Sequence, residues 1–124
     1  MVGRLAKAEQ FFRAAETIHA LADDDQEVGD AYVTLCVHAG IAAADAICCA
    51  ALQEHAQGES HVEAIKLMKR VRPDGDELAN ALEALLATKT RAGYSAQAVT
   101  VEQRKRAERS AQKLLRAARD RAVT

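Results

Sequence analysis

The sequence predicts an all-α protein, an antiparallel up-and-down bundle of four to five helices. Its 124 residues, 49% apolar and 28% charged, are enough for one domain with a hydrophobic core. The stretch 31–52, AYVTLCVHAGIAAADAICCAAL, carries one formal charge, Asp45, and is apolar nearly all round, which is typical of a helix surrounded by others. The flanking segments repeat apolar residues every three to four positions, and no stretch alternates like a strand. We therefore expect a single helical domain over residues 1–124.

The first two helices are separated by an acidic connector. Residues 4–21 place Leu5, Ala8, Phe12 and Ala15 at helical spacing, which predicts an amphipathic helix. The run 22–30, ADDDQEVGD, follows, and its aspartates are candidates to cap the next helix. The central helix is expected over about residues 27–53.

Small residues gather in the middle of the central helix. Gly40 is unfavourable in a helix by roughly 0.5–1 kcal/mol relative to Ala, so we expect a close contact with a crossing helix there. Together with Ala39, Ala43 and Ala44 it would also allow close approach of a second subunit. Aromatic residues make up only 3% of the chain, and a core of small side chains buries little area. We therefore expect a homodimer.

Turns and capping boxes delimit the remaining helices. A turn over 55–59, centred on Gly58, precedes Ser60-His-Val-Glu63, a capping box that starts a short helix to about residue 71. The turn Arg72-Pro73-Asp74-Gly75 ends that helix, and the next one covers residues 76–93. Its apolar stripe comprises Leu78, Leu82, Leu85 and Leu86 and is continued by Lys89.

A second capping box, Thr100 to Gln103, follows a loop over 94–99 and starts a last helix that ends near residue 122. We expect its Lys and Arg side chains to point outward and an inner stripe of Ala107, Ala111, Leu114, Ala118 and Ala122.

Charge is distributed unevenly along the chain. From Thr100 onward eight Lys and Arg residues accompany three Asp and Glu residues, a net charge of +5, whereas the first 99 residues carry −6. Either the basic helix docks on the acidic rest of the bundle, or it forms an electrostatic surface for a partner. In the second case Arg104, Lys105 and Arg109 are candidates to contact a nucleic-acid backbone. No aromatic residues alternate with them, so base stacking is not expected.

The cysteines and the N-terminal sequence favour a cytoplasmic protein. Cys36, Cys48 and Cys49 are odd in number, lack a CxxC spacing and lie in the central helix, which indicates buried reduced thiols. MVGRLAKAEQFF has no apolar segment typical of a signal peptide. Residues 31–52 are long enough to span a membrane, but acidic residues flank them, so we expect a core helix and no membrane partner.

Asp45 is the main polar anomaly, because an isolated buried carboxylate is costly. Lys89, Arg91 and Tyr94 are candidate partners, either in a structural ion pair or hydrogen bond or in a ligand site. His38 lies two turns before Asp45 on the same helical face. We expect a hydrogen-bonded core histidine, and His38 is also a candidate for the same polar groove. The sequence shows no zinc spacing, P-loop or GxGxxG motif, so we expect no metal and no cofactor.

Two motifs and the order of helices resemble the HEPN superfamily. The motifs are His38-Ala-Gly-Ile-Ala-Ala-Ala-Asp45-Ala-Ile in the central helix and Lys89-Thr-Arg91-Ala-Gly-Tyr94 at the end of the fourth. The resemblance covers about residues 5–120 and implies a dimeric four- to five-helix bundle. It also implies a polar groove where Asp45, Lys89, Arg91 and Tyr94 meet.

Catalytic HEPN proteins resemble metal-independent ribonucleases marked by an Arg with a His four to six residues later. This chain has no histidine after His61, and its one pair with that spacing near the start, Arg13 and His19, lies in the first helix and not near the end of the bundle. The resemblance therefore implies a non-catalytic binding or regulatory module. Its ligand would be a nucleotide, RNA or a partner protein such as a nucleotidyltransferase. Two alternatives remain open. One is a ribonuclease or toxin-like enzyme using Arg91, Lys89 and Asp45 or Tyr94, and the other is nucleic-acid binding through the last helix.

Overall fold

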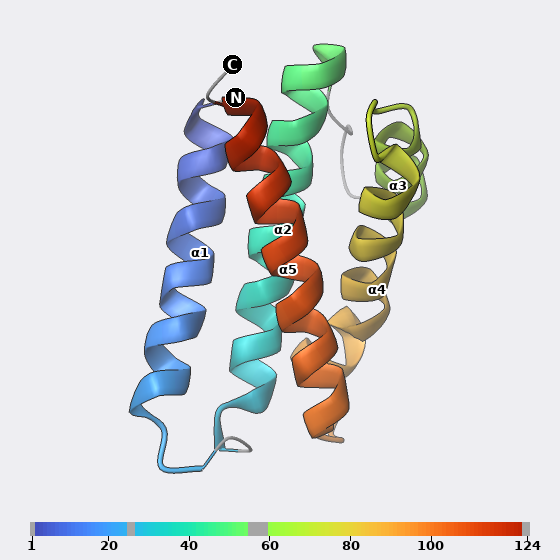
Figure 1. Cartoon of the computed structure of the whole chain (residues 1–124). Helices are drawn as coiled ribbons and strands as arrows, with labels where there is room; N and C mark the ends of the chain where they lie inside the picture. The colour runs from blue at the N-terminus through green and yellow to red at the C-terminus, as the bar shows by residue number, and fades with distance from the viewer. Residues whose placement is uncertain (1, 25–26, 55–59, 123–124) are drawn as a thin grey trace.

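The prediction of an all-α bundle is confirmed. The structure, a computed structural model, describes residues 2–24, 27–54 and 60–122. Within these residues it contains five helices and no strand: α1 (Val2–Leu21), α2 (Gly29–Leu52), α3 (His61–Lys69), α4 (Gly75–Gly93) and α5 (Val101–Ala122) (Figure 1). The turn expected around Gly58 lies outside the described residues.

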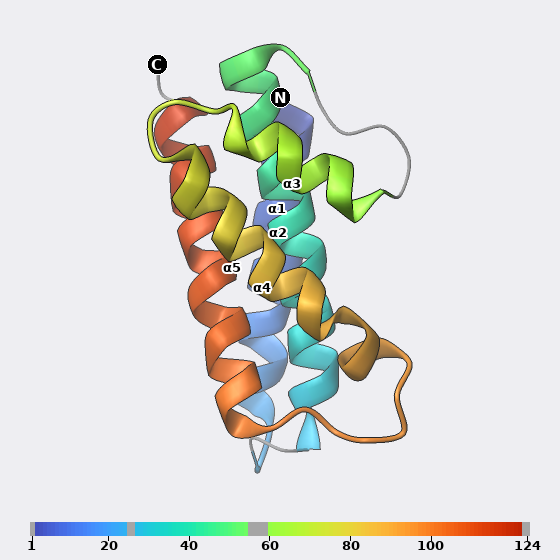
Figure 2. The same ribbon diagram turned by 90° about the vertical axis from the view of Figure 1, so that its right-hand side faces the viewer.

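The four long helices alternate in direction, as an up-and-down bundle requires. Helices α1 and α4 run opposite to α2 and α5, and α3 is a short insertion between α2 and α4 (Figure 1). Helices α2 and α5 pack together at the centre, with α1 on one side and α4 on the other. Figure 2 shows α4 crossing the bundle obliquely in front of this central pair. Helix α2 contacts all four other helices, as expected from its apolar sequence.

Small side chains in α2 allow the other helices to approach closely. A Cβ atom on Gly40 would overlap Leu85 Cδ1 of α4 and would lie 3.4 Å from Leu114 Cδ1 of α5. Ala39, Ala43 and Ala44 are also buried within the chain. The close contact with a crossing helix that was expected at Gly40 is thus confirmed. The further expectation that these small residues contact a second subunit is wrong, because helices of the same chain already cover them.

The capping residues were predicted with mixed success. Thr100 and Gln103 form the full box: the Thr100 N–H donates to Gln103 Oε1 at 2.8 Å, and the Gln103 N–H donates to Thr100 Oγ1 at 3.1 Å. At α3, Ser60 Oγ accepts the Glu63 N–H at 3.2 Å. The expected aspartate cap of α2 is wrong, because Val28 is the N-cap and no side chain caps that helix. On α5, Ala107, Ala111, Leu114 and Ala118 are buried as predicted, but Ala122 is exposed at the end of the helix.

By length and composition α2 could also cross a membrane. A buried core helix meets the same criteria, and more than half of the most apolar part of α2 is buried among the other helices. In this fold its apolar character is accounted for by its central position.

Candidate functional site

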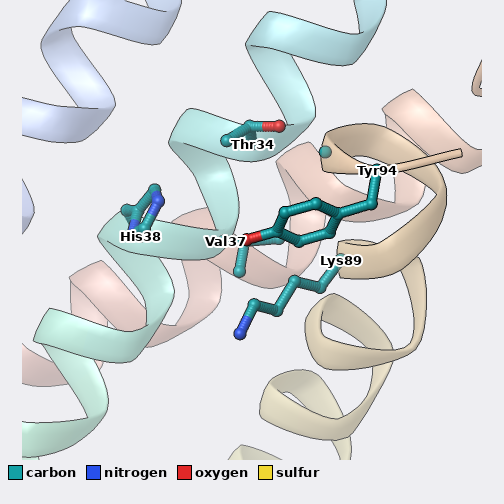
Figure 3. A pocket seen from close by; sticks show the side chains of 6 residues that line it. Thr34, Val37, His38, Lys89 and Tyr94 are labelled. Atoms are coloured by element: carbon teal, nitrogen blue, oxygen red, sulfur yellow. The ribbon is translucent and has the colours of Figure 1, made fainter.

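A pocket of about 330 Å³ lies between α2 and the C-terminal end of α4 (Figure 3). Thr34, Val37 and His38 of α2 form one side, and Lys89, Gly93 and Tyr94 form the other. The side chains of Lys89 and Tyr94 extend from α4 toward α2. The structure thus brings together His38, Lys89 and Tyr94, three of the five residues that the sequence suggested for a polar groove.

His38 is held at the pocket by a neighbouring aromatic ring. The expectation of a core histidine is wrong, because the residue is exposed. Its imidazole stacks on Phe11 of α1, with ring centroids 5.3 Å apart and an interplanar angle of 28°. The preceding residue, Val37, is buried and fixes this turn of α2 in the core. The imidazole is therefore anchored on one side while its edge remains available to a ligand.

Lys89 brings a positive charge into the pocket. It continues the apolar stripe of α4 and is half-buried, and its Nζ lies 3.2 Å from Nε2 of His61 in α3. The ammonium can donate to this nitrogen when the nitrogen carries no proton. Within the described part of the chain Lys89 forms no ion pair with a carboxylate, and none of the six lining residues is acidic. The ammonium charge is thus not neutralised at the pocket.

Tyr94 lies at the rim of the pocket, where 78% of it is exposed. Its backbone N–H donates to Thr90 O at 2.8 Å and fixes the residue at the end of α4. The following loop is attached at two points: Arg91 Nε donates to Ala98 O at 3.1 Å, and the Val99 N–H donates to Asp30 Oδ1 at 2.8 Å. Arg91 therefore stabilises the loop and is not one of the residues that line the pocket.

Asp45 does not line the pocket either. Seven residues along α2 place it about 10 Å from His38 along the helix axis. It is half-buried, and it affects a neighbouring thiol: burial, together with the Asp45 carboxylate, raises the pKa of Cys48 to about 12. The groove predicted for Asp45, Lys89, Arg91 and Tyr94 is thus only partly assembled. The same four residues were the candidates for an atypical ribonuclease.

The expectation for the cysteines is confirmed in part. None of the three forms a disulfide; Cys36 and Cys48 are buried, whereas Cys49 is only half-buried. Burial also raises the pKa of Cys36 to about 12. Both buried thiols are therefore protonated at neutral pH.

Arg104 corrects the prediction that the basic side chains of the last helix point outward. It is only 7% exposed, and its guanidinium lies 5.8 Å from the ring centroid of Tyr32 and 3.5 Å from Glu108 Oε2. The Tyr32 hydroxyl donates to the same carboxylate at 2.8 Å. Burial, the neighbouring Cys36 and the bond to Glu108 together raise the pKa of Tyr32. Arg104 is thus part of a buried polar cluster, whereas Lys105 and Arg109 are exposed as predicted.

The cluster of Tyr32, Arg104 and Glu108 was not predicted from the sequence. The i,i+4 spacing of Arg104 and Glu108 was the available signal for the ion pair. Tyr32 has no such signal, because it lies on a different helix.

No metal centre is formed by the described residues: across 2–24, 27–54 and 60–122, no three His, Cys, Asp or Glu side chains converge as ligands. Comparisons of the chain with protein families, curated proteins and solved structures give no match. Any functional conclusion therefore depends on the geometry of the site.

Proposed function

We propose that the protein is a HEPN-like binding module whose pocket holds a small anionic ligand, a nucleotide with its phosphate at Lys89. The observation that carries the proposal is the ammonium of Lys89, which is not neutralised by a carboxylate in a pocket without acidic lining residues. Hydrogen bonds to charged groups are worth about 1.5–3 kcal/mol, so a phosphate would bind where this charge is available.

The other lining groups suit the rest of a nucleotide. Tyr94 presents an exposed ring on which a base could stack, and Thr34 and His38 offer hydrogen-bonding groups on the opposite side. A volume of about 330 Å³ is near the lower limit of ligand pockets and suits a mononucleotide better than a larger cofactor. Both motifs that resemble the HEPN superfamily supply residues of this pocket: His38 lies in the first motif, and Lys89 and Tyr94 lie in the second.

The test is a calorimetric titration of the protein with AMP, with inorganic phosphate as a second probe. Replacing the cation in Lys89→Gln is expected to weaken AMP binding about tenfold or more, because it removes a charge-assisted bond of about 1.5–3 kcal/mol. Lys66→Gln is the matched control: Lys66 is an exposed lysine of α3, away from the pocket. Circular dichroism verifies that both variants are folded.

A second pair of variants tests whether the adenine base of AMP stacks on Tyr94. Tyr94→Ala should weaken AMP binding but leave phosphate binding unchanged, whereas Tyr94→Phe should retain most of the affinity for AMP. If the parent protein does not bind AMP at millimolar concentration, or if Lys89→Gln binds it equally well, the proposal is wrong.

Dimerisation, a cytoplasmic location and a nucleotidyltransferase partner remain part of the proposal. The sedimentation mass tests the first of these. A contact surface between subunits would have to use a face other than Ala39, Gly40, Ala43 and Ala44, which are buried in the single chain.

A further inference from the structure

Helix α5 carries a line of cations on the face beside α4. Arg106, Arg109, Lys113 and Arg116 are exposed and follow one another at intervals of three, four and three residues, which places them on one side of the helix. They span about 15 Å along its axis. These four residues are called the basic stripe below.

The basic stripe borders a groove of about 350 Å³ between α4 and α5. Arg106, Arg109 and Lys113 line one wall, and the opposite wall contains Asn80, Ala81 and Ala84 of α4, with the carboxylate of Glu77 at the end near Lys113. The small alanine side chains leave the groove open beside the guanidinium groups. Helix α4 separates this groove from the Lys89 pocket, which lies on its other side toward α2.

The bundle neutralises only part of the charge of α5. Arg119 forms a bidentate pair with Glu9 at 2.6 Å, and Lys113 lies 3.6 Å from Glu77. Arg106, Arg109 and Arg116 have no ion-pair partner among the residues that the structure describes. Three guanidinium groups without a carboxylate partner along one face of a helix create a positive potential that favours a polyanion.

We propose that the basic stripe and the adjoining groove bind the phosphate backbone of a nucleic acid without reading its sequence. A linear array of arginines matches a linear array of phosphates, to which arginine can bind through two parallel hydrogen bonds. No aromatic side chain lines the groove, so recognition of bases by stacking is not expected.

Two other polyanions fit the surface less well. An anionic membrane would require large apolar side chains beside the cations, but the exposed large apolar residue of α5 is Val101, at the start of the helix and outside the stripe. An acidic peptide would require an apolar pocket for an anchoring side chain, whereas the walls of the groove carry alanine, asparagine and serine between the charges.

The test is fluorescence anisotropy with a labelled 20-base-pair DNA duplex and a labelled single-stranded RNA 20-mer, at 50 and 200 mM salt. With four phosphates neutralised, affinity for the duplex should fall about 150-fold over this range and affinity for the single strand about 50-fold. In the double variant Arg106→Gln, Arg109→Gln, the salt effect on duplex binding should shrink to about 12-fold, because two contacts remain. The ratio of the two affinities indicates which nucleic acid is preferred.

The matched control is Arg4→Gln, Arg13→Gln, which removes the same charge from α1, away from the stripe and the groove. It should reduce the salt dependence little. Equal loss in both double variants would mean that net charge alone drives binding and would overturn the proposal. The same conclusion would follow if anionic phosphatidylglycerol vesicles or polyglutamate bound more tightly than either nucleic acid. None of these variants alters a residue of the Lys89 pocket, so failure here leaves AMP binding unaffected.

Discussion

Gly40→Ala tests the close approach of α2 and α4, the two helices whose residues line the pocket. The added methyl group would overlap Leu85 Cδ1 and would lie 3.4 Å from Leu114 Cδ1. Leu85 and Leu114 are both 0% exposed, so neither can move away into solvent. Overpacking of this kind costs about 1–3 kcal/mol, and replacing Gly by Ala inside a helix regains about 0.5–1 kcal/mol. The expected net loss is on the order of 1 kcal/mol in the free energy of unfolding.

Urea denaturation measures this loss, with Gly3→Ala as the control. Gly3 also lies in a helix, but a Cβ atom there has nothing within 4 Å, so that variant should be as stable as the parent or slightly more stable. Leu85→Ala alone should cost about 2–5 kcal/mol. In the double variant the new methyl group occupies space that Leu85 vacates, so the combined loss should be smaller than the sum of the single losses.

The same substitution should also affect binding. His38 lies two residues before Gly40, and Lys89 lies four residues after Leu85, so displacing α4 from α2 changes the separation of the two pocket walls. AMP affinity should fall while the salt dependence of nucleic-acid binding stays unchanged. A Gly40→Ala protein with the stability and AMP affinity of the parent would refute the close approach as the reason for this glycine.

Two further predictions concern stability. Thr100→Ala removes the acceptor for the Gln103 N–H and should lower the free energy of unfolding by about 1 kcal/mol in urea denaturation, whereas an unchanged value would contradict the capping role. The free energy of unfolding should also fall as the pH rises from 9 toward 12. Burial raises the pKa of Cys36 and of Cys48 from the ordinary 9.0 to about 12 in the folded state. Above pH 9 the folded state therefore binds more protons than the unfolded state, and rising pH favours unfolding. Urea denaturation between pH 8 and 11 measures this slope, which should be shallower in Cys36→Ala; equal slopes would show that the thiol does not contribute.

Local signals account for the parts of the fold that were predicted. The Thr100–Gln103 box and the Pro73 turn each depend on residues close together in the sequence, and both delimit helices where expected. The apolar stripe Leu78, Leu82, Leu85 likewise faces the core, because a helical period determines which residues share a face. These features need no knowledge of the partner helix.

The inward orientation of Arg104 depends on such a partner. Arg104 lies three residues before Ala107 and seven before Ala111, so it belongs to the inner stripe of α5 by position. Its charge nevertheless favoured an outward placement, because burying an unpaired cation is costly. The Tyr32 ring and the Glu108 carboxylate offset this cost, and the hydrogen bond that joins those two spans 76 positions of sequence. Helical periodicity alone could not have identified this contact.

The candidate site was likewise predictable only in part. Lys89 and Tyr94 lie at the end of one helix, and His38 lies on the exposed face of another, so their convergence required only that α2 and α4 be neighbours. Arg91 could not be placed in this way, because a flexible side chain can reach several acceptors and here it donates to the carbonyl of Ala98. Arg91 holds the loop after α4, and the course of that loop cannot be predicted because its sequence has no periodic pattern.

The uneven charge of the chain had two interpretations from sequence, and α5 combines elements of both. Arg119 pairs with Glu9, and Arg104 is buried against Tyr32 and Glu108, so part of the helix does dock on the bundle. Arg106 and Arg109 line a groove that contains one carboxylate, Glu77. That carboxylate pairs with Lys113 and not with either arginine. Folding therefore neutralises the residues that pack against α1 and α2 and leaves the α4-facing arginines charged at the surface. Lys89, on the other side of α4, also has no carboxylate partner among the described residues, and this shared lack of neutralisation is why we propose an anionic ligand for each site.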